Sequence, residues 1–226
     1  MSLHPQVVQL LERAAKSPLP QYWQVPPAVA RRLYRDTRGA LTPDPPAVES
    51  SILLLAPGPA GPVPLRAYRP KGARRDEALP ALVYCHGGGW VIGDLDTHDV
   101  VCRTLANGAR CAVFSVEYRK APEAPFPAAV EDCFAALAFV SRNSESLRVN
   151  ATQLAVGGDS AGGNLATVIA LMARDAGGPP LALQLLIYPA TDQRMAHPSI
   201  EKNGEGYLLT KKNMLYFRGH YLPRAA

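Results

Sequence analysis

The sequence LAVGGDSAGGNLA at residues 154–166 decides the fold. It begins as a short apolar strand and ends as an apolar helical run, and between the two Gly158, Ser160 and Gly162 form a G-x-S-x-G pattern. A serine on so sharp a turn has a strained backbone, and the residues two positions away must be small because larger side chains would collide. We therefore expect the Ser160 hydroxyl to stand exposed at a helix start, where the helix dipole favours negative charge.

Strands and helices alternate on both sides of this stretch. Strands are predicted at 48–55, 63–68, 81–85, 111–116, 152–156 and 181–188, and helices at 97–109, 128–140 and 161–173. The first two strands are joined by the Pro- and Gly-rich residues 57–62, which favour a hairpin. This alternation predicts an α/β fold with a largely parallel sheet, in which ligands bind at the carboxyl ends of the strands.

The two ends of the chain lie outside this alternation. Apolar residues at helical spacing predict helices at 5–16 and 26–38, and a Pro-rich joint at 42–46 separates them from the strands. After Pro189 the rhythm stops, and one more helix is predicted near 210–221, with Thr210 as its N-cap. We therefore divide the chain into an accessory segment at 1–46, a core at 47–190 and a second accessory segment at 191–226.

Composition and charge exclude several classes of protein. The 226 residues are 47% hydrophobic and 19% charged, which is typical of globular proteins. The net charge of +5 is scattered without a dense Lys/Arg tract, so we expect no nucleic-acid partner. The sequence offers neither a membrane helix nor a signal peptide, so we expect no membrane association and a cytoplasmic location. Reduced, buried thiols without a metal or a disulfide are predicted for Cys85, Cys102, Cys111 and Cys133.

A second glycine-rich motif follows the predicted strand at 81–85. The sequence HGGGW at 86–90 lies at the carboxyl end of that strand, as the serine motif does at the end of its own. A serine that attacks a carbonyl needs N–H donors for the oxyanion, and a glycine run lets the backbone approach the substrate closely. We expect the oxyanion to be held by the N–H groups of Gly87, Gly88 and Ala161, with Ser160 as the nucleophile.

With both motifs in place, the chain resembles the hormone-sensitive-lipase-like family of α/β-hydrolases, the bacterial carboxylesterases with HGGGW and GDSAGG boxes. The sequences EYRKAPEAPFPAAVED at 117–132 and YPATD at 188–192 extend the resemblance to nearly the whole chain. It implies an α/β-hydrolase sheet with helices on both faces and a helical cap made from the two accessory segments. It also implies hydrolysis of small-molecule esters with short to medium acyl chains through a serine acyl-enzyme, without a cofactor. A homodimer of the complete protein is left open.

Each motif can also be explained by a purely structural role, without catalysis. A lone G-x-S-x-G or HGGG can be an ordinary turn at the end of a strand. The glycine-rich stretch at 157–164 lacks the Gly-Lys-Ser/Thr of a phosphate loop and the G-x-G-x-x-G of a dinucleotide fold. The resemblance gives His86 a structural role, and we expect Trp90 to shape the loop or the acyl pocket. Asp159 is interpreted as a hydrogen-bonding neighbour of the serine turn.

The catalytic acid and histidine that should follow Ser160 are missing. The sequence holds neither the D-P-L-x-D-E-like nor the H-G-F-like segment of the family, and the later histidines, His197 and His220, lie in the second accessory segment. Asp192 is interpreted as a structural carboxylate. We therefore expect a truncated chain that lacks the last two strands, exposes LALQLLIY at 181–188 as a sheet edge and is nearly inactive, whereas the complete protein is active. The alternative is a non-catalytic, hydrolase-like protein that binds a small ligand, or an inactive fragment.

Overall fold

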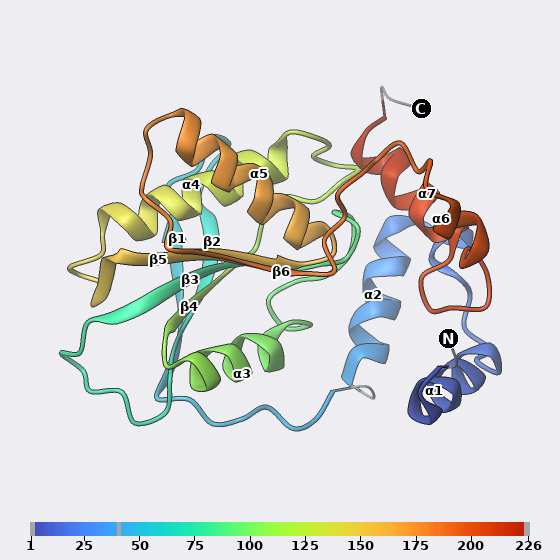
Figure 1. The fold of residues 1–226 in the computed structure, drawn as a ribbon, viewed down its shortest axis with the longest axis horizontal. Helices are drawn as coiled ribbons and strands as arrows, with labels where there is room; N and C mark the ends of the chain where they lie inside the picture. Colours follow the sequence, from blue (N-terminus) through green and yellow to red (C-terminus); the bar gives the residue numbers. More distant parts are fainter. Residues whose placement is uncertain (1–2, 40–41, 224–226) are drawn as a thin grey trace.

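The computed structural model describes residues 3–39 and 42–223, and its centre is a six-stranded sheet (Figure 1). The strand order is β1-β2-β4-β3-β5-β6. The strands are β1 (Ser50–Ala56), β2 (Val63–Arg69), β3 (Leu79–Cys85), β4 (Ala112–Val116), β5 (Val149–Asp159) and β6 (Leu183–Ile187). All six lie where the sequence predicts a strand, with ends that differ by a few residues.

The pairing of the strands confirms the predicted α/β class. β3 pairs in parallel with β4 and with β5, and β5 pairs in parallel with β6. β1 and β2 form the expected antiparallel hairpin, and β2 runs antiparallel to β4. The apolar strands β3 and β4 are buried almost throughout because they lie in the middle of the order with helices on both sides.

Helices cover both faces of the sheet. In Figure 1, α4 (Ala128–Arg142) and α5 (Ala161–Asp175) lie on one face, and α3 (Asp99–Ala109) lies on the other. The main core cluster fills the α4–α5 side, and a smaller cluster that includes Cys102 and Ala106 of α3 fills the opposite side. All four cysteines are free and buried in these layers.

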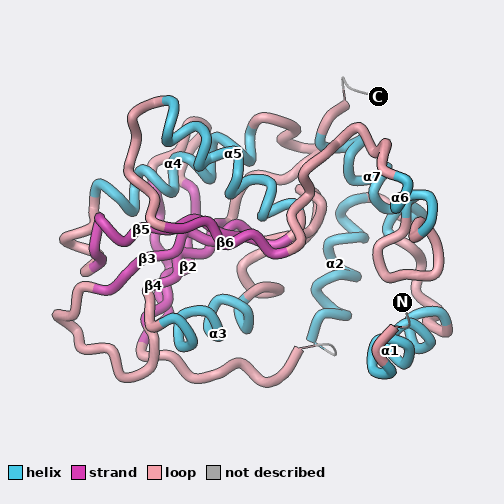
Figure 2. The backbone as a smooth tube through the Cα atoms, in the orientation of Figure 1, coloured by secondary structure: helices cyan, strands magenta, loops and turns pink. Residues whose placement is uncertain are grey.

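The two ends of the chain come together beside the sheet (Figure 2). The N-terminal elements are α1 (Pro5–Ala15), the 3-10 turn η1 (Tyr22–Gln24) and α2 (Pro27–Arg38), and the C-terminal ones are α6 (Pro198–Lys202) and α7 (Lys211–Tyr221). Asn213 joins them, since its Oδ1 accepts from Trp23 N at 3.3 Å and its Nδ2 donates to Gln21 Oε1 at 3.3 Å. Thr210 caps α7 as predicted, whereas η1 and α6 were not predicted. Within the described ranges, no helix is long and apolar enough to cross a membrane.

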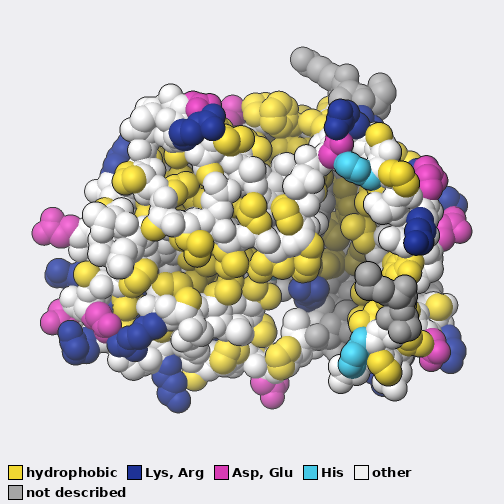
Figure 3. Space-filling model, viewed as in Figure 1, with side chains coloured by type: hydrophobic (Ala, Val, Ile, Leu, Met, Phe, Trp, Pro, Cys, Tyr) yellow, Lys and Arg dark blue, Asp and Glu magenta, His cyan; other side chains and the backbone are white. Residues whose placement is uncertain are grey.

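β6 forms one border of the sheet and pairs only with β5 in the part of the chain that the structure describes. Four of its five residues are apolar, and the exposed fractions reach 59% for Leu183 and 39% for Leu186. Figure 3 shows hydrophobic side chains gathered across the middle of the face that is turned toward the viewer, where β6 lies in Figure 1. This edge therefore agrees with the expectation of an apolar, uncovered strand.

Candidate active site

Ser160 occupies the sharp turn between β5 and α5. Its φ of 54° and ψ of −115° place a non-glycine residue in a sparsely populated backbone region. Three backbone hydrogen bonds hold it there: Ser160 N donates to Ile187 O at 2.9 Å, and Ser160 O accepts from Ala190 N at 3.0 Å and from Asn164 N at 3.1 Å. The strain expected from the sequence is therefore present, and the chain leaving β6 helps to fix it.

Two glycines of this turn have no room for a side chain. A Cβ on Gly158 or on Gly162 would collide with the Cys85 carbonyl oxygen at the end of β3. A collision with backbone cannot be relieved by a change of rotamer, so both positions require glycine. The G-x-S-x-G pattern is therefore explained by the close approach of the serine turn to β3.

The HGGGW loop follows β3 directly and has an unusual backbone. Three consecutive residues have positive φ: Gly88 at 120°, Gly89 at 58° and Trp90 at 60°. The loop closes as a tight turn, because Val91 N and Ile92 N both donate to Gly88 O, at 3.1 and 2.9 Å.

The N–H groups of the two motifs differ in availability. Gly87 N donates to Asp159 Oδ1 at 2.9 Å, so this amide is already engaged inside the protein. In the described part of the chain, the amides of Gly88 and Gly89 have no hydrogen-bond acceptor. Ala161 is the first residue of α5, and its amide has no acceptor within the helix. Of the three expected donors, Gly87 is therefore already engaged, whereas Gly88 and Ala161 are free and Gly89 offers a further free amide.

Asp159, next to the serine, is a buried carboxylate that ties the two motifs together. Its Oδ1 accepts from Tyr84 OH at 2.7 Å as well as from Gly87 N, and His98 Nε2 lies 3.4 Å away. Burial by itself would raise the pKa of Asp159, but the interactions with His98, Tyr84 and Gly87 outweigh it and lower the pKa to about 2. The carboxylate is therefore ionised, and it acts as the predicted hydrogen-bonding neighbour of the turn.

His86 is fully buried behind the loop. Its Nδ1 lies 2.8 Å from Gly87 O, and its ring stacks on Tyr118 with centroids 4.3 Å apart. Burial, together with the nearby His98 and Lys120, moves the pKa of His86 well below its usual range. A neutral, enclosed imidazole of this kind supports the loop and is not placed to take a proton from Ser160.

The later histidines lie away from the serine. His197 Nε2 is 3.4 Å from Asp192 Oδ2 on an exposed segment, and the His220 ring contacts Tyr216 with centroids 4.5 Å apart. Asp192 also binds Arg194, with Nη2 and Oδ2 2.8 Å apart. All five histidines of the chain lie within the described residues, and none of them hydrogen-bonds to Ser160. A base for Ser160 is therefore not assembled from these residues.

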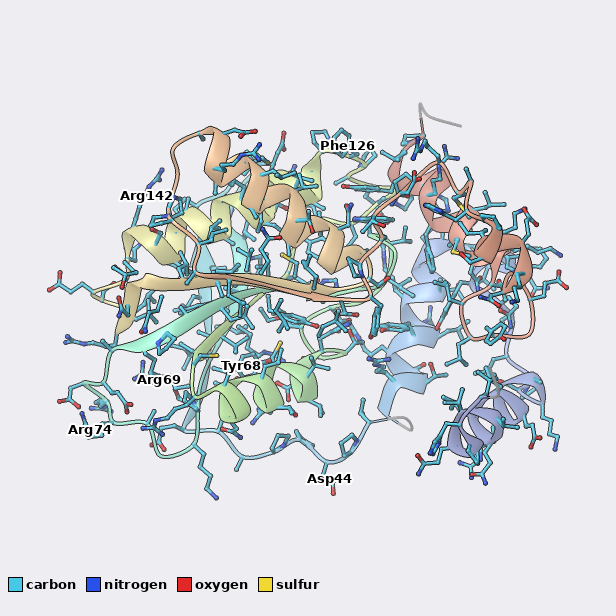
Figure 4. All side chains as sticks on the ribbon, viewed as in Figure 1. Asp44, Tyr68, Arg69, Arg74, Phe126 and Arg142 are labelled. Atoms are coloured by element: carbon cyan, nitrogen blue, oxygen red, sulfur yellow. The ribbon has the colours of Figure 1, made fainter. Side chains whose placement is uncertain are left out.

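The C-terminal helix α7 packs on the glycine loop, a contact that the sequence did not reveal. A Cβ on Gly89 would collide with the Phe217 ring, and the Trp90 indole stacks on Tyr221 with centroids 4.4 Å apart. Figure 4 shows Phe126 in the loop before α4, on the side toward α7, and its amide donates to Tyr221 O at 3.0 Å. Helix α7 thus closes the outer side of the loop.

Other possible sites lie away from the two motifs. A pocket of about 690 Å³ lies between η1 and the α6–α7 segment and is lined by Trp23 and Lys212 among others, with no residue of either motif. Among the described residues, no group of three or more His, Cys, Asp or Glu side chains is placed to hold a metal ion. The motif residues therefore define the candidate site.

A family model described as alpha/beta hydrolase fold matches residues 82–226, which include both motifs. The chain belongs to the alpha/beta hydrolase fold family. Two curated relatives illustrate the match. The carboxylic ester hydrolase LipN of Mycobacterium tuberculosis is 48% identical over 174 residues, covering 75% of this chain and 46% of the relative. The ethyl acetate hydrolase of Pseudomonas putida is 36% identical over 232 residues, covering 98% of this chain and 71% of the relative.

Solved structures agree with this membership. An ester hydrolase from the metagenome of Lake Arreo, complexed with a bipyridine phosphonate derivative, superposes with a TM-score of 0.93 at 42% identity over 99% of this chain and 71% of its own. A hyperthermophilic esterase from Pyrobaculum calidifontis superposes with a TM-score of 0.90 at 39% identity. The match covers 98% of this chain and 71% of the esterase chain. The resemblance of this alpha/beta hydrolase to hormone-sensitive-lipase-like carboxylesterases is therefore confirmed. The chain spans about half the length of the first curated relatives that it matches.

Proposed function

We propose that this chain carries the nucleophile and the oxyanion hole of a carboxylic ester hydrolase. The observation that carries the proposal is Ser160 on its strained turn, with the unpaired amides of Gly88, Gly89 and Ala161 on the two neighbouring strand ends. Preorganised donors of this kind are worth about 10²–10³ in rate for each donor. Names of relatives such as carboxylesterase and ethyl acetate hydrolase support the same reaction.

The reaction is acyl transfer in two steps. Ser160 Oγ loses its proton to a base and attacks the acyl carbon, and the carbonyl oxygen becomes the oxyanion that the three amides bind. The ester C–O bond then breaks, the protonated base gives its proton to the leaving oxygen, and a neutral alcohol departs from the acyl-serine. Water, deprotonated by the same base, attacks the acyl-serine, and the carboxylic acid and free Ser160 are released. A histidine and an acid are required for both steps. Since no histidine of these 226 residues is placed for this role, the proposal assigns activity to the complete protein that supplies both groups.

Short to medium acyl esters are the substrate class that we propose. A relative named for ethyl acetate, a very small ester, supports this size. The helices at 1–46 and 191–226 are proposed to form the cap over the site, since α7 already packs on the glycine loop through Phe217 and Tyr221. A cap held this close to the oxyanion loop limits the room for a long acyl chain.

Hydrolysis of p-nitrophenyl acetate, butyrate and palmitate by the complete protein tests the proposal. We expect butyrate and acetate to be cleaved faster than palmitate. Ser160→Ala should lower the rate by at least about 10³-fold, because the acyl-enzyme can no longer form. The exposed Ser146→Ala is the matched control and should leave the rate unchanged. Equal rates for the protein and Ser160→Ala would exclude Ser160 as the nucleophile.

A non-catalytic, ligand-binding role is the second candidate. It is favoured by one observation, the lack of any histidine in contact with Ser160 among the described residues. In that case the complete protein would bind a small ester or carboxylate without turnover, and Ser160→Ala would alter affinity only. Calorimetric titration with butyrate, run beside the hydrolysis assay, separates the two functions.

A further inference from the structure

We propose that His98 is a positioning residue for the oxyanion loop and acts on it through the Asp159 carboxylate. The proposal rests on the proposed function only in assigning the oxyanion to this loop. His98 lies at the start of α3, far from the glycine motif in the sequence, and it contacts no group that we place against the substrate. Its role would be to hold the carboxylate that in turn holds Gly87.

The position of His98 is enclosed and polar. The side chain is fully buried, and its ring lies 5.3 Å from the His86 ring and 6.5 Å from the Tyr34 ring, measured between centroids. Its Nε2 faces Asp159 Oδ1 at 3.4 Å. Among the described residues, His98 is the only cationic or basic side chain within ion-pair distance of Asp159.

Hydrogen bonding on the other side of the ring fixes where its proton lies. Thr97 Oγ1 is 3.0 Å from His98 Nδ1, accepts from Asp94 N and has Asp94 O at 2.9 Å as a second acceptor. If the Thr97 hydroxyl donates to Nδ1, the neutral ring carries its proton on Nε2. If the hydroxyl donates to Asp94 O, then Nδ1 must donate to Oγ1. Nε2 must then be protonated as well, because otherwise its lone pair would face a buried carboxylate.

Both arrangements therefore place a proton on His98 Nε2, which lies 3.4 Å from Asp159 Oδ1 in an ion-pair contact without hydrogen-bond geometry. His86, in the same interior region, has the opposite pattern. Tyr118 OH donates to His86 O at 2.8 Å, so the Tyr118 hydrogen is not available for His86 Nδ1. Nδ1 must then carry the proton that goes to Gly87 O, and His86 Nε2 has no hydrogen-bond partner among the described atoms. The structure thus assigns a proton to Nε2 of His98 and a proton to Nδ1 alone of His86.

The link from His98 to the loop is short. Asp159 Oδ1 receives Tyr84 OH at 2.7 Å and Gly87 N at 2.9 Å, on the same oxygen that faces His98. Gly87 lies so close to this carboxylate that a Cβ at position 87 would collide with Asp159 Oδ2. Any movement of the carboxylate therefore displaces Gly87 and, with it, the free amides of Gly88 and Gly89.

The first test uses the unaltered protein. Nitrogen-15 NMR of the histidine rings at neutral pH should show His98 protonated at Nε2 and His86 protonated at Nδ1 alone. The Gly87 amide proton should resonate at low field, as expected for a donor to a carboxylate. An unprotonated His98 Nε2 would overturn the proposal. These spectra do not depend on turnover. The predicted protonation of His98 can therefore be confirmed even if the Ser160→Ala assay shows that the protein is not a hydrolase.

The second test compares two variants of similar size. His98→Gln keeps an N–H at the same number of bonds from Cβ as Nε2, whereas His98→Met fills the space without a donor. Met should move the Gly87 amide signal to higher field. In the complete protein it should also lower kcat on p-nitrophenyl butyrate on the order of 10²-fold with KM nearly unchanged, as misplaced catalytic groups do. His98→Gln should keep most of the Gly87 amide shift and most of the kcat of the unaltered protein.

A control separates this effect from general loss of stability. Tyr68→Phe removes another buried donor to a carboxylate, the 2.8 Å bond to Asp99 on the α3 side of the sheet (Figure 4). It should destabilise the fold without changing the Gly87 signal. If Met and Gln gave the same Gly87 shift and the same kcat, His98 would act by packing alone and the proposal would fail. If His98→Met does not fold, the ring spectra of the unaltered protein decide the matter.

Discussion

The Trp90 indole stacks on the Tyr221 ring, with centroids 4.4 Å apart and planes within 1° of parallel. Trp90 belongs to the glycine loop and Tyr221 is the last residue of α7, so the contact joins the candidate oxyanion loop to the C-terminal helix. Both rings are at least 95% buried. Trp90 also has positive φ, and the stack helps to hold that conformation.

Tyr221→Ala is expected to loosen this loop. Truncating a buried aromatic side chain costs about 3–5 kcal/mol of unfolding free energy, whereas Tyr221→Phe keeps the stack and should cost less than about 1.5 kcal/mol. Urea unfolding followed by tryptophan fluorescence measures both variants. The Trp90 emission of folded Tyr221→Ala should also shift to longer wavelength as water reaches the indole. Equal stabilities for the Ala and Phe variants would show that the stack contributes nothing.

Two helical glycines should respond in opposite ways to alanine. Gly162→Ala places a Cβ against the Cys85 carbonyl oxygen, so the serine turn must open and ester hydrolysis by the complete protein should fall below detection. Gly108→Ala in α3 meets nothing within 4 Å and should stabilise the protein by up to about 1 kcal/mol, because alanine favours the helix. Thermal unfolding and p-nitrophenyl butyrate assays measure both variants. Retained activity in Gly162→Ala would contradict the fit of the turn.

Asp159 should make the protein sensitive to acid. Its pKa of about 2 in the folded state lies below the ordinary aspartate value of 3.8, so the ionised form stabilises the fold. This contribution, about 2 kcal/mol, is fully present above pH 3.8 and is lost as the pH falls toward 2. Urea unfolding at pH 7, 4, 3 and 2 should therefore show the stability gap between the protein and Asp159→Asn narrowing below pH 4. A gap that stays constant over this range would contradict the lowered pKa.

Arg31 on α2 is expected to stabilise through backbone contacts more than through its ion pair. Its Nε donates to Val91 O at 2.7 Å and its Nη2 to Ala121 O at 2.8 Å, while the ion pair is with the largely exposed Glu123. Arg31→Met leaves both carbonyls without this donor and should cost about 2 kcal/mol. Glu123→Gln should cost less than about 1 kcal/mol, since exposed ion pairs contribute little. Chemical unfolding of the two variants checks this order, and a larger loss for Glu123→Gln would reverse the argument.

Much of the fold could be predicted because its signals are local. Apolar or mixed extended segments between turn residues indicated all six strands, and the Gly158–Ser160–Gly162 pattern placed the strained turn between β5 and α5. A positive φ at Ser160 and the need for small neighbours follow from steric limits within a few residues. The short elements η1 and α6 escaped prediction because three to five residues carry too little periodicity.

The availability of each amide was decided by tertiary structure alone. The sequence places three glycines in one run, and nothing in that run distinguishes Gly87 from Gly89 as an oxyanion donor. The distinction arises because Asp159, 72 residues later, takes the Gly87 N–H, while Phe217 packs against Gly89 from α7. A hydrogen bond between distant residues depends on how the strands and helices meet in space. The sequence by itself therefore determined where the proposed nucleophile, Ser160, stands, and the packing of β3, β5 and α7 decided which amides of the glycine loop remain free of hydrogen bonds.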